Sequence, residues 1–228
     1  MIKTDINGNI GIISIDRPPV NAINPELVSS LSESLDSFHS NDSIQGVILE
    51  GRSGIFSAGL DITHLFPKDR EYIKTFWESF SSLLNKMFTY EKPLYSSIGG
   101  HCPAGGTVMV IMTDYRIMAN GKYVIGLNEV DVGLTVPYGI GNVFQYVVGQ
   151  RKAEDLLLKA KLISPEDALK NLSKIFFCST GVIPIPLSFI SINGSSLSQL
   201  HKISIFVAFA DIESVSYTHL TLPTTPYV

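Results

Sequence analysis

The sequence is poor in cysteine, in long hydrophobic runs and in charge of one sign, and each shortage excludes a class of protein. Only Cys102 and Cys178 occur among the 228 residues, with no disulfide framework or zinc-site spacing, so a reducing compartment is expected. No run of 18 apolar residues is present, so no membrane span is expected. A formal net charge of −4 predicts no general attraction to nucleic acid or to an anionic membrane surface.

The first residues also lack the pattern of a targeting segment. They contain neither the apolar core of a signal peptide nor an Arg-rich amphipathic presequence, so no address is visible. Hydrophobic residues make up 45% of the chain and charged residues 17%, which excludes a disordered chain, a collagen and a coiled coil. The length is sufficient for one sizeable buried core.

Strand and helix patterns alternate up to residue 170, and this alternation is typical of an α/β fold. Short apolar runs predict strands at 10–15, 46–50, 94–98 and 115–119. Helical stretches are expected near 71–89 and 105–112. Another helix is expected to start after Ser164, which would be its cap.

The clearest helix signal begins at Asn24. Asn24 can cap the helix and Pro25 suits its first position. Apolar residues then recur at spacings of three and four, which predicts one buried face made of Leu27, Val28, Leu31, Leu35 and Phe38.

The composition changes abruptly after Lys170. The chain has 17 Lys and Arg and 21 Asp and Glu, but only four of these lie beyond that residue: Lys174, Lys202, Asp211 and Glu213. Residues 171–228 are rich in Ser, Thr, Pro, Ile and Phe and have no sustained helical or strand period. We therefore expect a core domain at 1–170 and an aberrant tail at 171–228 to which no secondary structure is assigned.

Two glycine-bearing turns follow predicted strands. Residues 56–61 follow the strand at 46–50, and residues 99–106 lead into the apolar helix near 105–112. Small residues there let a ligand approach unpaired backbone N–H groups, and two such groups converging on one oxygen would form an oxyanion hole. Each turn taken singly is also explained as an ordinary tight turn in which glycine supplies a positive φ.

Together with four other segments, these turns resemble the crotonase (enoyl-CoA hydratase/isomerase) superfamily, and most closely its Δ3,Δ2-enoyl-CoA isomerases. The matching segments are residues 17–22 (RPPVNA), 46–49 (GVIL), 56–61 (FSAGLD), 102–106 (CPAGG), 113–119 (TDYRIMA) and 125–129 (IGLNE). They occur in order and at family spacing over residues 1–170. The resemblance implies a crotonase-like ββα superhelix, an acyl-CoA thioester substrate, no cofactor apart from the coenzyme A of that substrate, and no metal.

The resemblance also implies roles for individual residues. The backbone N–H groups of Leu60 and Gly105 would hold the thioester oxygen. Glu129 stands at the position of the catalytic glutamate, after a strand expected at 123–126. A solvated loop carboxylate is the alternative for Glu129. The substrate path would be lined by the first turn and its neighbour, namely Ala22, Ala58, Gly59, Leu60, Asp61 and Ile62, together with Gly105.

The type of reaction depends on one further position. Shifting a double bond requires a proton to leave carbon 2 and a proton to return at carbon 4, and one carboxylate can do both. A hydratase of this family usually carries a second glutamate, and in this register Val108 stands there. The sequence therefore favours isomerisation of 3-enoyl-CoA to 2-enoyl-CoA in fatty-acid β-oxidation over hydration by the same scaffold.

Several other residues have weaker claims. His101 beside Cys102 suggests a thiol nucleophile, but adjacent residues seldom face each other productively. Asp61 is better explained as a cap or turn residue than as an acid. His64, Lys68 and Arg70 offer contacts to coenzyme A phosphates, although a solvated loop explains them better.

The resemblance stops where the composition changes. Family members continue into charged C-terminal helices that cover the acyl site and join subunits into trimers, and this helical region is expected to be lost or replaced here. A homotrimer is therefore in doubt, and a non-catalytic remnant stays open as an alternative. The resemblance implies that the protein is located in the mitochondrial matrix. A peroxisomal or cytoplasmic location is left open.

Overall fold

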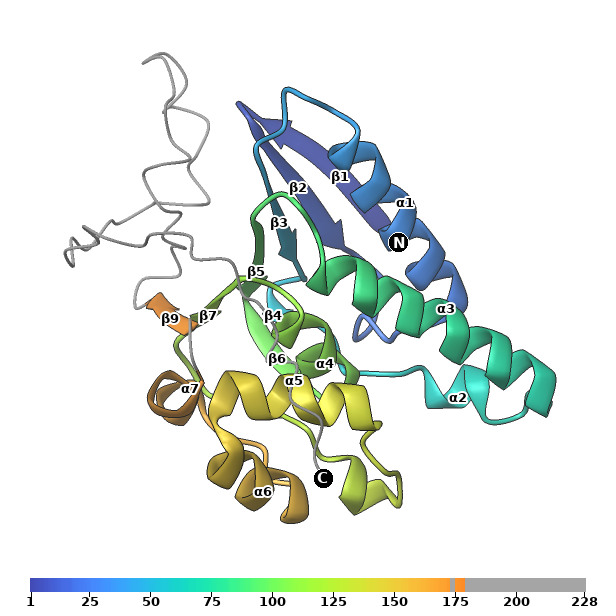
Figure 1. Cartoon of the computed structure of the whole chain (residues 1–228), viewed down its shortest axis with the longest axis vertical. Helices are drawn as coiled ribbons and strands as arrows, with labels where there is room; N and C mark the ends of the chain where they lie inside the picture. The colour runs from blue at the N-terminus through green and yellow to red at the C-terminus, as the bar shows by residue number, and fades with distance from the viewer. Residues whose placement is uncertain (173–174, 179–228) are drawn as a thin grey trace, which may run out of the picture.

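The computed structural model describes residues 1–172 and 175–178 (Figure 1). Its main sheet has six strands in the order β1–β2–β3–β5–β7–β9. These strands are β1 (Ile2–Asn7), β2 (Ile10–Ile15), β3 (Gly46–Glu50), β5 (Leu94–Ile98), β7 (Tyr115–Ala119) and β9 (Ile175–Cys178). β1 and β2 are antiparallel, and every other neighbouring pair is parallel.

A smaller parallel sheet lies beside the main one and determines where the chain turns. Its strands are β4 (Gly54–Ile55), β6 (Gly100–Pro103) and β8 (Ile125–Gly126), in that order. Each of them follows a strand of the main sheet, β3, β5 or β7, as the next strand along the chain. Because parallel strands end at the same edge, the three segments that follow β4, β6 and β8 leave the small sheet together.

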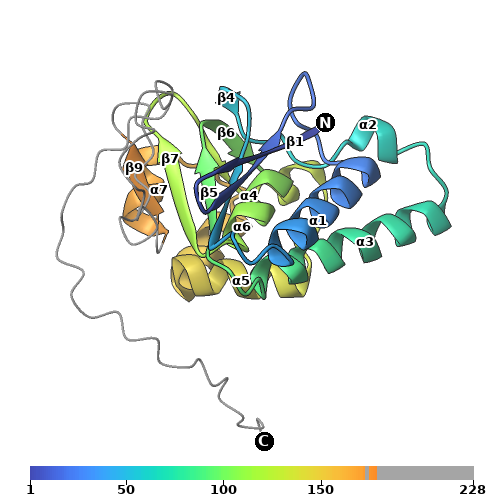
Figure 2. The ribbon, with the colours of Figure 1, turned by 90° about the horizontal axis from the view of Figure 1, so that it is seen from above.

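Helices α1 (Pro25–His39) and α3 (Arg70–Phe88) lie side by side, and Figure 2 shows them beside the β1–β2 end of the main sheet. Their buried faces join the strands in one hydrophobic core. The remaining helices are α2 (Ile62–Leu65), α4 (Gly105–Ile111), the 3-10 helix η1 (Glu129–Val132), α5 (Tyr138–Val148), α6 (Gln150–Leu158) and α7 (Pro165–Asn171).

The strongest sequence patterns are confirmed. The Asn24 side chain accepts a hydrogen bond from the Leu27 amide at 3.0 Å, Pro25 begins α1, and the five expected apolar residues are buried. The strands expected at 10–15, 46–50, 94–98 and 115–119 form with those bounds, and α7 begins after Ser164. One-faced apolar spacing in α1 and continuous apolar runs in the buried strands β3 and β5 are thus sufficient to place these elements.

Other elements differ from expectation. The strand expected at 123–126 is confined to Ile125–Gly126. Strand β1 is not predicted from the sequence because it has no apolar run: it is an edge strand, and four of its six residues are exposed. Helices α5 and α6 were also not expected, although each buries one side against the rest of the core.

The α/β architecture continues past Lys170. Helix α7 ends at Asn171, and the backbone of β9 pairs in parallel with β7 at the edge of the main sheet. The rest of the proposed tail and the expected loss of C-terminal helices lie outside the described residues. The boundary at Lys170 therefore stays a prediction. Within the described ranges, no helix is both long enough and apolar enough to cross a membrane.

Candidate active site

The segments that follow β4, β6 and β8 surround a cavity of about 240 Å³. Five of the residues expected from the sequence line it: Ala58, Leu60, Ile62, Gly105 and Glu129. The other three, Ala22, Gly59 and Asp61, do not line it. The cavity therefore brings together residues from three distant parts of the chain.

The first turn presents the amide of Leu60. Gly59 has a φ of +97°, a conformation that favours glycine. On either side of Leu60 the backbone is tied to Ile23, since the Ile23 amide donates to the Gly59 carbonyl and the Asp61 amide donates to the Ile23 carbonyl, both at 2.8 Å. The Leu60 amide itself donates to no acceptor in the described part of the chain.

The second turn presents the amide of Gly105 beside it. Ala104 has φ +48° and ψ −125°, a strained backbone for a residue with a side chain, and its amide donates to the Gly126 carbonyl at 2.8 Å. Gly105 then begins α4, and among residues 1–172 its amide has no acceptor. A Cβ placed on Gly105 would lie 3.3 Å from the Leu60 nitrogen, so the two turns touch.

Close packing, rather than backbone conformation, explains the glycines of this second turn. Neither Gly105 nor Gly106 has a positive φ, so the tight-turn explanation is wrong for both of them and holds for Gly59. A Cβ on Gly106 would lie 2.6 Å from the Ser57 carbonyl oxygen. The absence of side chains lets the two turns approach until two unpaired N–H groups lie close together.

Glu129 supplies the carboxylate of the cavity. It begins η1, with two residues between it and the end of β8. Its Oε2 atom is buried without a hydrogen-bond partner among the described residues. No other residue lining the cavity within 1–172 and 175–178 is ionisable. Burial raises the pKa of the Glu129 carboxyl above its ordinary value, because water no longer solvates the charged form fully. A raised pKa suits a group that must both take up and release a proton.

The rest of the cavity wall is mainly apolar. Val108, 4% exposed, lies on α4, and the α3 residues Trp77 and Phe80 pack their rings 6.0 Å apart. Val136 and Ile140 contribute from the chain at the start of α5. The sequence indicated no role for the α3 and α5 residues, because amphipathic spacing identifies a buried face but not a cavity within it.

Asp61 and Ala22 support the first turn from outside the cavity. The Asp61 carboxylate caps α2 by accepting the His64 amide and pairs with the Arg17 guanidinium at 2.6 Å. Arg17 also donates to the Ala22 carbonyl at 3.1 Å. Burial alone would raise the pKa of Asp61, but these hydrogen bonds and the Arg17 charge outweigh burial and lower it. Asp61 is thus the N-cap of α2, as the sequence favoured.

The weaker candidates have structural partners instead. Cys102 is fully buried, which raises the pKa of its thiol well above the ordinary value, and the His101 ring meets the edge of Tyr123. His64 Nε2 lies 2.9 Å from the Tyr72 hydroxyl. Lys68 lies over the ring of that same tyrosine, 5.0 Å from its centroid. None of these four side chains lines the cavity.

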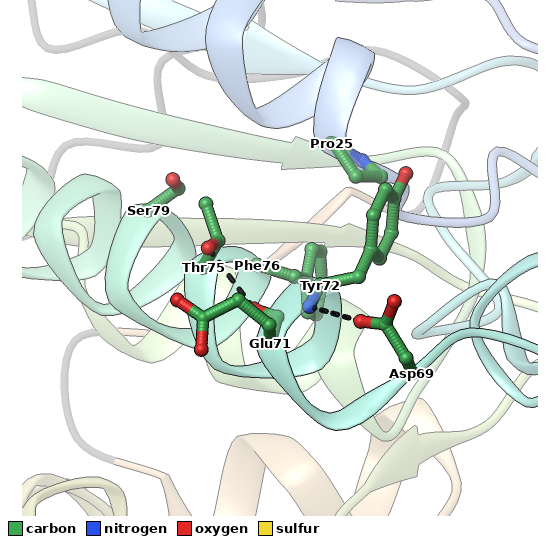
Figure 3. A pocket seen from close by; sticks show the side chains of 7 residues that line it. All are labelled: Pro25, Asp69, Glu71, Tyr72, Thr75, Phe76 and Ser79. Atoms are coloured by element: carbon green, nitrogen blue, oxygen red, sulfur yellow. Dashed lines mark hydrogen bonds between the residues drawn. The ribbon is translucent and has the colours of Figure 1, made fainter.

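A second hollow, of about 360 Å³, lies along the N-terminal half of α3 (Figure 3). It is lined by Pro25 of α1 and by Asp69, Glu71, Tyr72, Thr75, Phe76 and Ser79. The Asp69 carboxylate there accepts the Tyr72 amide at 2.8 Å, which is an ordinary helix cap. None of the expected site residues lines this second hollow, so the first cavity is the candidate active site. Across the described residues, no group of three His, Cys, Asp or Glu side chains is arranged to hold a metal ion.

Comparison with known proteins identifies relatives of this chain. The family model described as "Enoyl-CoA hydratase/isomerase" matches residues 5–171. The mitochondrial enoyl-CoA delta isomerase 1 of Mus musculus is 34% identical over 172 residues, which cover 75% of this chain and 60% of that protein. Its counterpart from Homo sapiens is 33% identical and is covered to 57%.

A solved structure agrees with these sequence matches. The crystal structure of human mitochondrial delta3-delta2-enoyl-CoA isomerase superposes with a TM-score of 0.74 at 30% identity, covering 77% of this chain and 70% of that one. The chain thus spans about three fifths of the length of the curated relatives named above.

Proposed function

The chain belongs to the enoyl-CoA hydratase/isomerase family, and we propose that it shifts the double bond of a 3-enoyl-CoA to the 2-position. One observation carries this proposal: among the described residues that line the cavity, Glu129 has the sole ionisable side chain. In the register of the family resemblance, Val108 replaces the second carboxylate that a hydratase uses to activate water. A single carboxylate is sufficient for isomerisation.

The proposed reaction moves one proton and one pair of π electrons. The thioester oxygen accepts hydrogen bonds from the Leu60 and Gly105 amides, and the Glu129 carboxylate takes a proton from carbon 2. The electrons of that C–H bond delocalise onto the thioester oxygen, where the two amides stabilise the negative charge. The electrons then return from the thioester oxygen and form a double bond between carbons 2 and 3. The π electrons of the original double bond between carbons 3 and 4 form a new C–H bond at carbon 4 with the proton that Glu129 gives back.

The apolar wall supports an acyl chain as the part of the substrate that enters the cavity. Burying methylene groups against Trp77, Phe80 and Ile140 is favourable because apolar surface leaves water. The names of the mouse and human relatives support a mitochondrial place, and with it a role in fatty-acid β-oxidation.

Two assays on one preparation test this function. Conversion of 3-enoyl-CoA to 2-enoyl-CoA should be much faster than hydration of 2-enoyl-CoA. Glu129→Gln should lower the isomerisation rate by about 10²-fold or more, because the amide keeps the shape but cannot accept the proton. Binding of a saturated acyl-CoA, measured by calorimetry, should be nearly unchanged in this variant. Hydration as fast as isomerisation, or a variant that keeps more than about a tenth of the parent rate, contradicts the proposal.

A further inference from the structure

Thr107, in the first turn of α4, has a hydroxyl whose hydrogen bonds reach two strands of the small sheet. The residue is fully buried and is not among the residues that line the cavity. Its hydroxyl donates to the Cys102 carbonyl of β6 at 2.5 Å and accepts from the Gly126 amide of β8 at 2.9 Å. Because a hydroxyl has one hydrogen, the Gly126 carbonyl oxygen, 3.1 Å away, is the weaker of its two acceptors. One side chain therefore joins α4, β6 and β8.

Gly126 is held at both of its backbone polar groups by residues on either side of Gly105, the proposed oxyanion donor. Its amide donates to Thr107, and its carbonyl accepts the Ala104 amide at 2.8 Å. Its φ is +145°, and a Cβ placed on it would lie 2.8 Å from the Lys161 carbonyl oxygen, so the chain also leaves it little room in that direction. Gly126 is therefore fixed in place relative to the second turn.

The connection from Gly126 to the proposed base is short and packed. Glu129 lies three residues beyond Gly126, and Leu127 between them is buried in the core. A close-packed segment of this length passes a displacement on, because protein interiors have low compressibility. The hydrogen bonds of Thr107 thus link the start of α4, where Gly105 presents its amide, to the segment that carries Glu129.

We propose that Thr107 is a positioning residue whose hydroxyl holds the Gly105 amide and the Glu129 carboxylate in the relative placement that proton transfer needs. The inference rests on the proposed function, in which both groups act on one thioester, the amide at its oxygen and the carboxylate at carbons 2 and 4. The two must be in place together, because the charge that develops on the oxygen is stabilised only while the donor faces it. Loss of the hydroxyl should therefore lower kcat rather than weaken substrate binding.

Thr107→Val tests this role, because valine keeps the branched shape but has no hydroxyl. We expect kcat for 3-enoyl-CoA to fall by about 10- to 10²-fold while KM stays within about twofold of the parent, since a reacting group is misplaced but no substrate contact is removed. Thr107→Ser keeps the hydroxyl and should restore most of the lost kcat. Circular dichroism checks folding, and Thr107→Ala takes the place of the valine variant if that variant does not fold.

Thr113→Val is the matched control at the other end of α4. Thr113 is also buried, follows the C-cap of this helix and does not line the cavity. Its hydroxyl donates to the Val110 carbonyl at 2.8 Å, so the same substitution removes a buried hydrogen bond there too. Both valine variants should unfold at lower urea concentrations than the parent, but only Thr107→Val should lose kcat. An equal loss of kcat in both, a Thr107→Val kcat within about twofold of the parent, or a serine variant as slow as valine overturns the inference.

A measurement without turnover separates this inference from the proposed function. Amide hydrogen exchange at Gly126, followed by NMR, should be about tenfold faster or more in Thr107→Val than in Thr113→Val, because the amide has lost its hydroxyl acceptor. Equal exchange in the two variants also overturns the inference. A parent chain without isomerase turnover refutes the proposed function, whereas faster exchange at Gly126 in that chain's valine variant retains the link between α4 and the Glu129 segment.

Discussion

The contact between the two turns makes Gly105→Ala an informative perturbation. The added Cβ would lie 3.0 Å from Ile23 Cδ1, 3.2 Å from Gly59 Cα and 3.3 Å from the Leu60 nitrogen. The Ile23 methyl is the end of a flexible side chain and can move, but the other two atoms belong to the backbone of the first turn. The turn must therefore shift by a few tenths of an ångström, and the Leu60 amide moves with it.

The size of the expected effect follows from the geometry of charge stabilisation. Oxyanion donors act at about 2.7–3.1 Å, and removing one donor typically costs about 10²- to 10³-fold in kcat. A displaced donor is weakened rather than removed, so we expect kcat to fall by about 10- to 10²-fold. Gly105 is the first residue of α4, where alanine gains less than the ~1 kcal/mol typical of a helix interior, so this gain offsets only a small part of the packing strain. The variant should thus lose activity and melt somewhat below the parent.

Steady-state kinetics with 3-enoyl-CoA and thermal melting separate the two effects. Gly139→Ala in α5 is the matched control, because nothing lies within 4 Å of a Cβ built there. That control should keep the parent kcat. The reasoning is refuted if Gly105→Ala melts like the parent and keeps its kcat within about twofold, a loss of less than ~0.4 kcal/mol of transition-state stabilisation.

Two further predictions concern stability. The pKa of Glu129 is raised above its unfolded value of 4.5, so its contribution to stability is full below that pH and is lost as pH rises through the folded pKa. Glu129→Gln should therefore melt above the parent at pH 8, and the gap should close towards pH 4; a gap that is the same at both pH values contradicts this. Asn21→Ala removes two buried hydrogen bonds that the side chain donates to the Ile15 and Phe56 carbonyls, both 2.9 Å. It also removes a partly buried hydrogen bond that the side chain accepts from the Arg17 amide at 2.8 Å. Because buried partners are left unpaired, the free energy of unfolding measured in urea should fall by about 3 kcal/mol. A fall of less than about 1 kcal/mol would refute this prediction.

The fold was predictable from sequence where local patterns and burial coincide. Helix α1 carries its own cap, its own proline at the first position and a single apolar face, so all its determinants lie within 16 residues of chain, Asn24 to His39. Strand β1 lacks such a pattern because an edge strand with exposed side chains needs no apolar run. Strand β4 has only two residues, too few for any period to be recognised.

The candidate site was predictable only in part. The resemblance pointed to Leu60, Gly105 and Glu129, yet nothing local to these residues says that they meet. They meet because β4, β6 and β8 are parallel and end at one edge. Trp77 and Phe80 gave no signal of their own, since any apolar face of a core helix has the same pattern.

The sequence by itself determined the α/β alternation, the capped helix at Asn24 and the family to which the chain belongs, because these depend on residue type and spacing. Tertiary structure alone decided the rest. It imposes the positive φ on Ala104, which has a side chain, while Gly105 is needed for space. It also leaves the Asn128 and Glu129 oxygens buried without partners. Such strain and desolvation arise only when distant segments are packed together, so no local pattern records them.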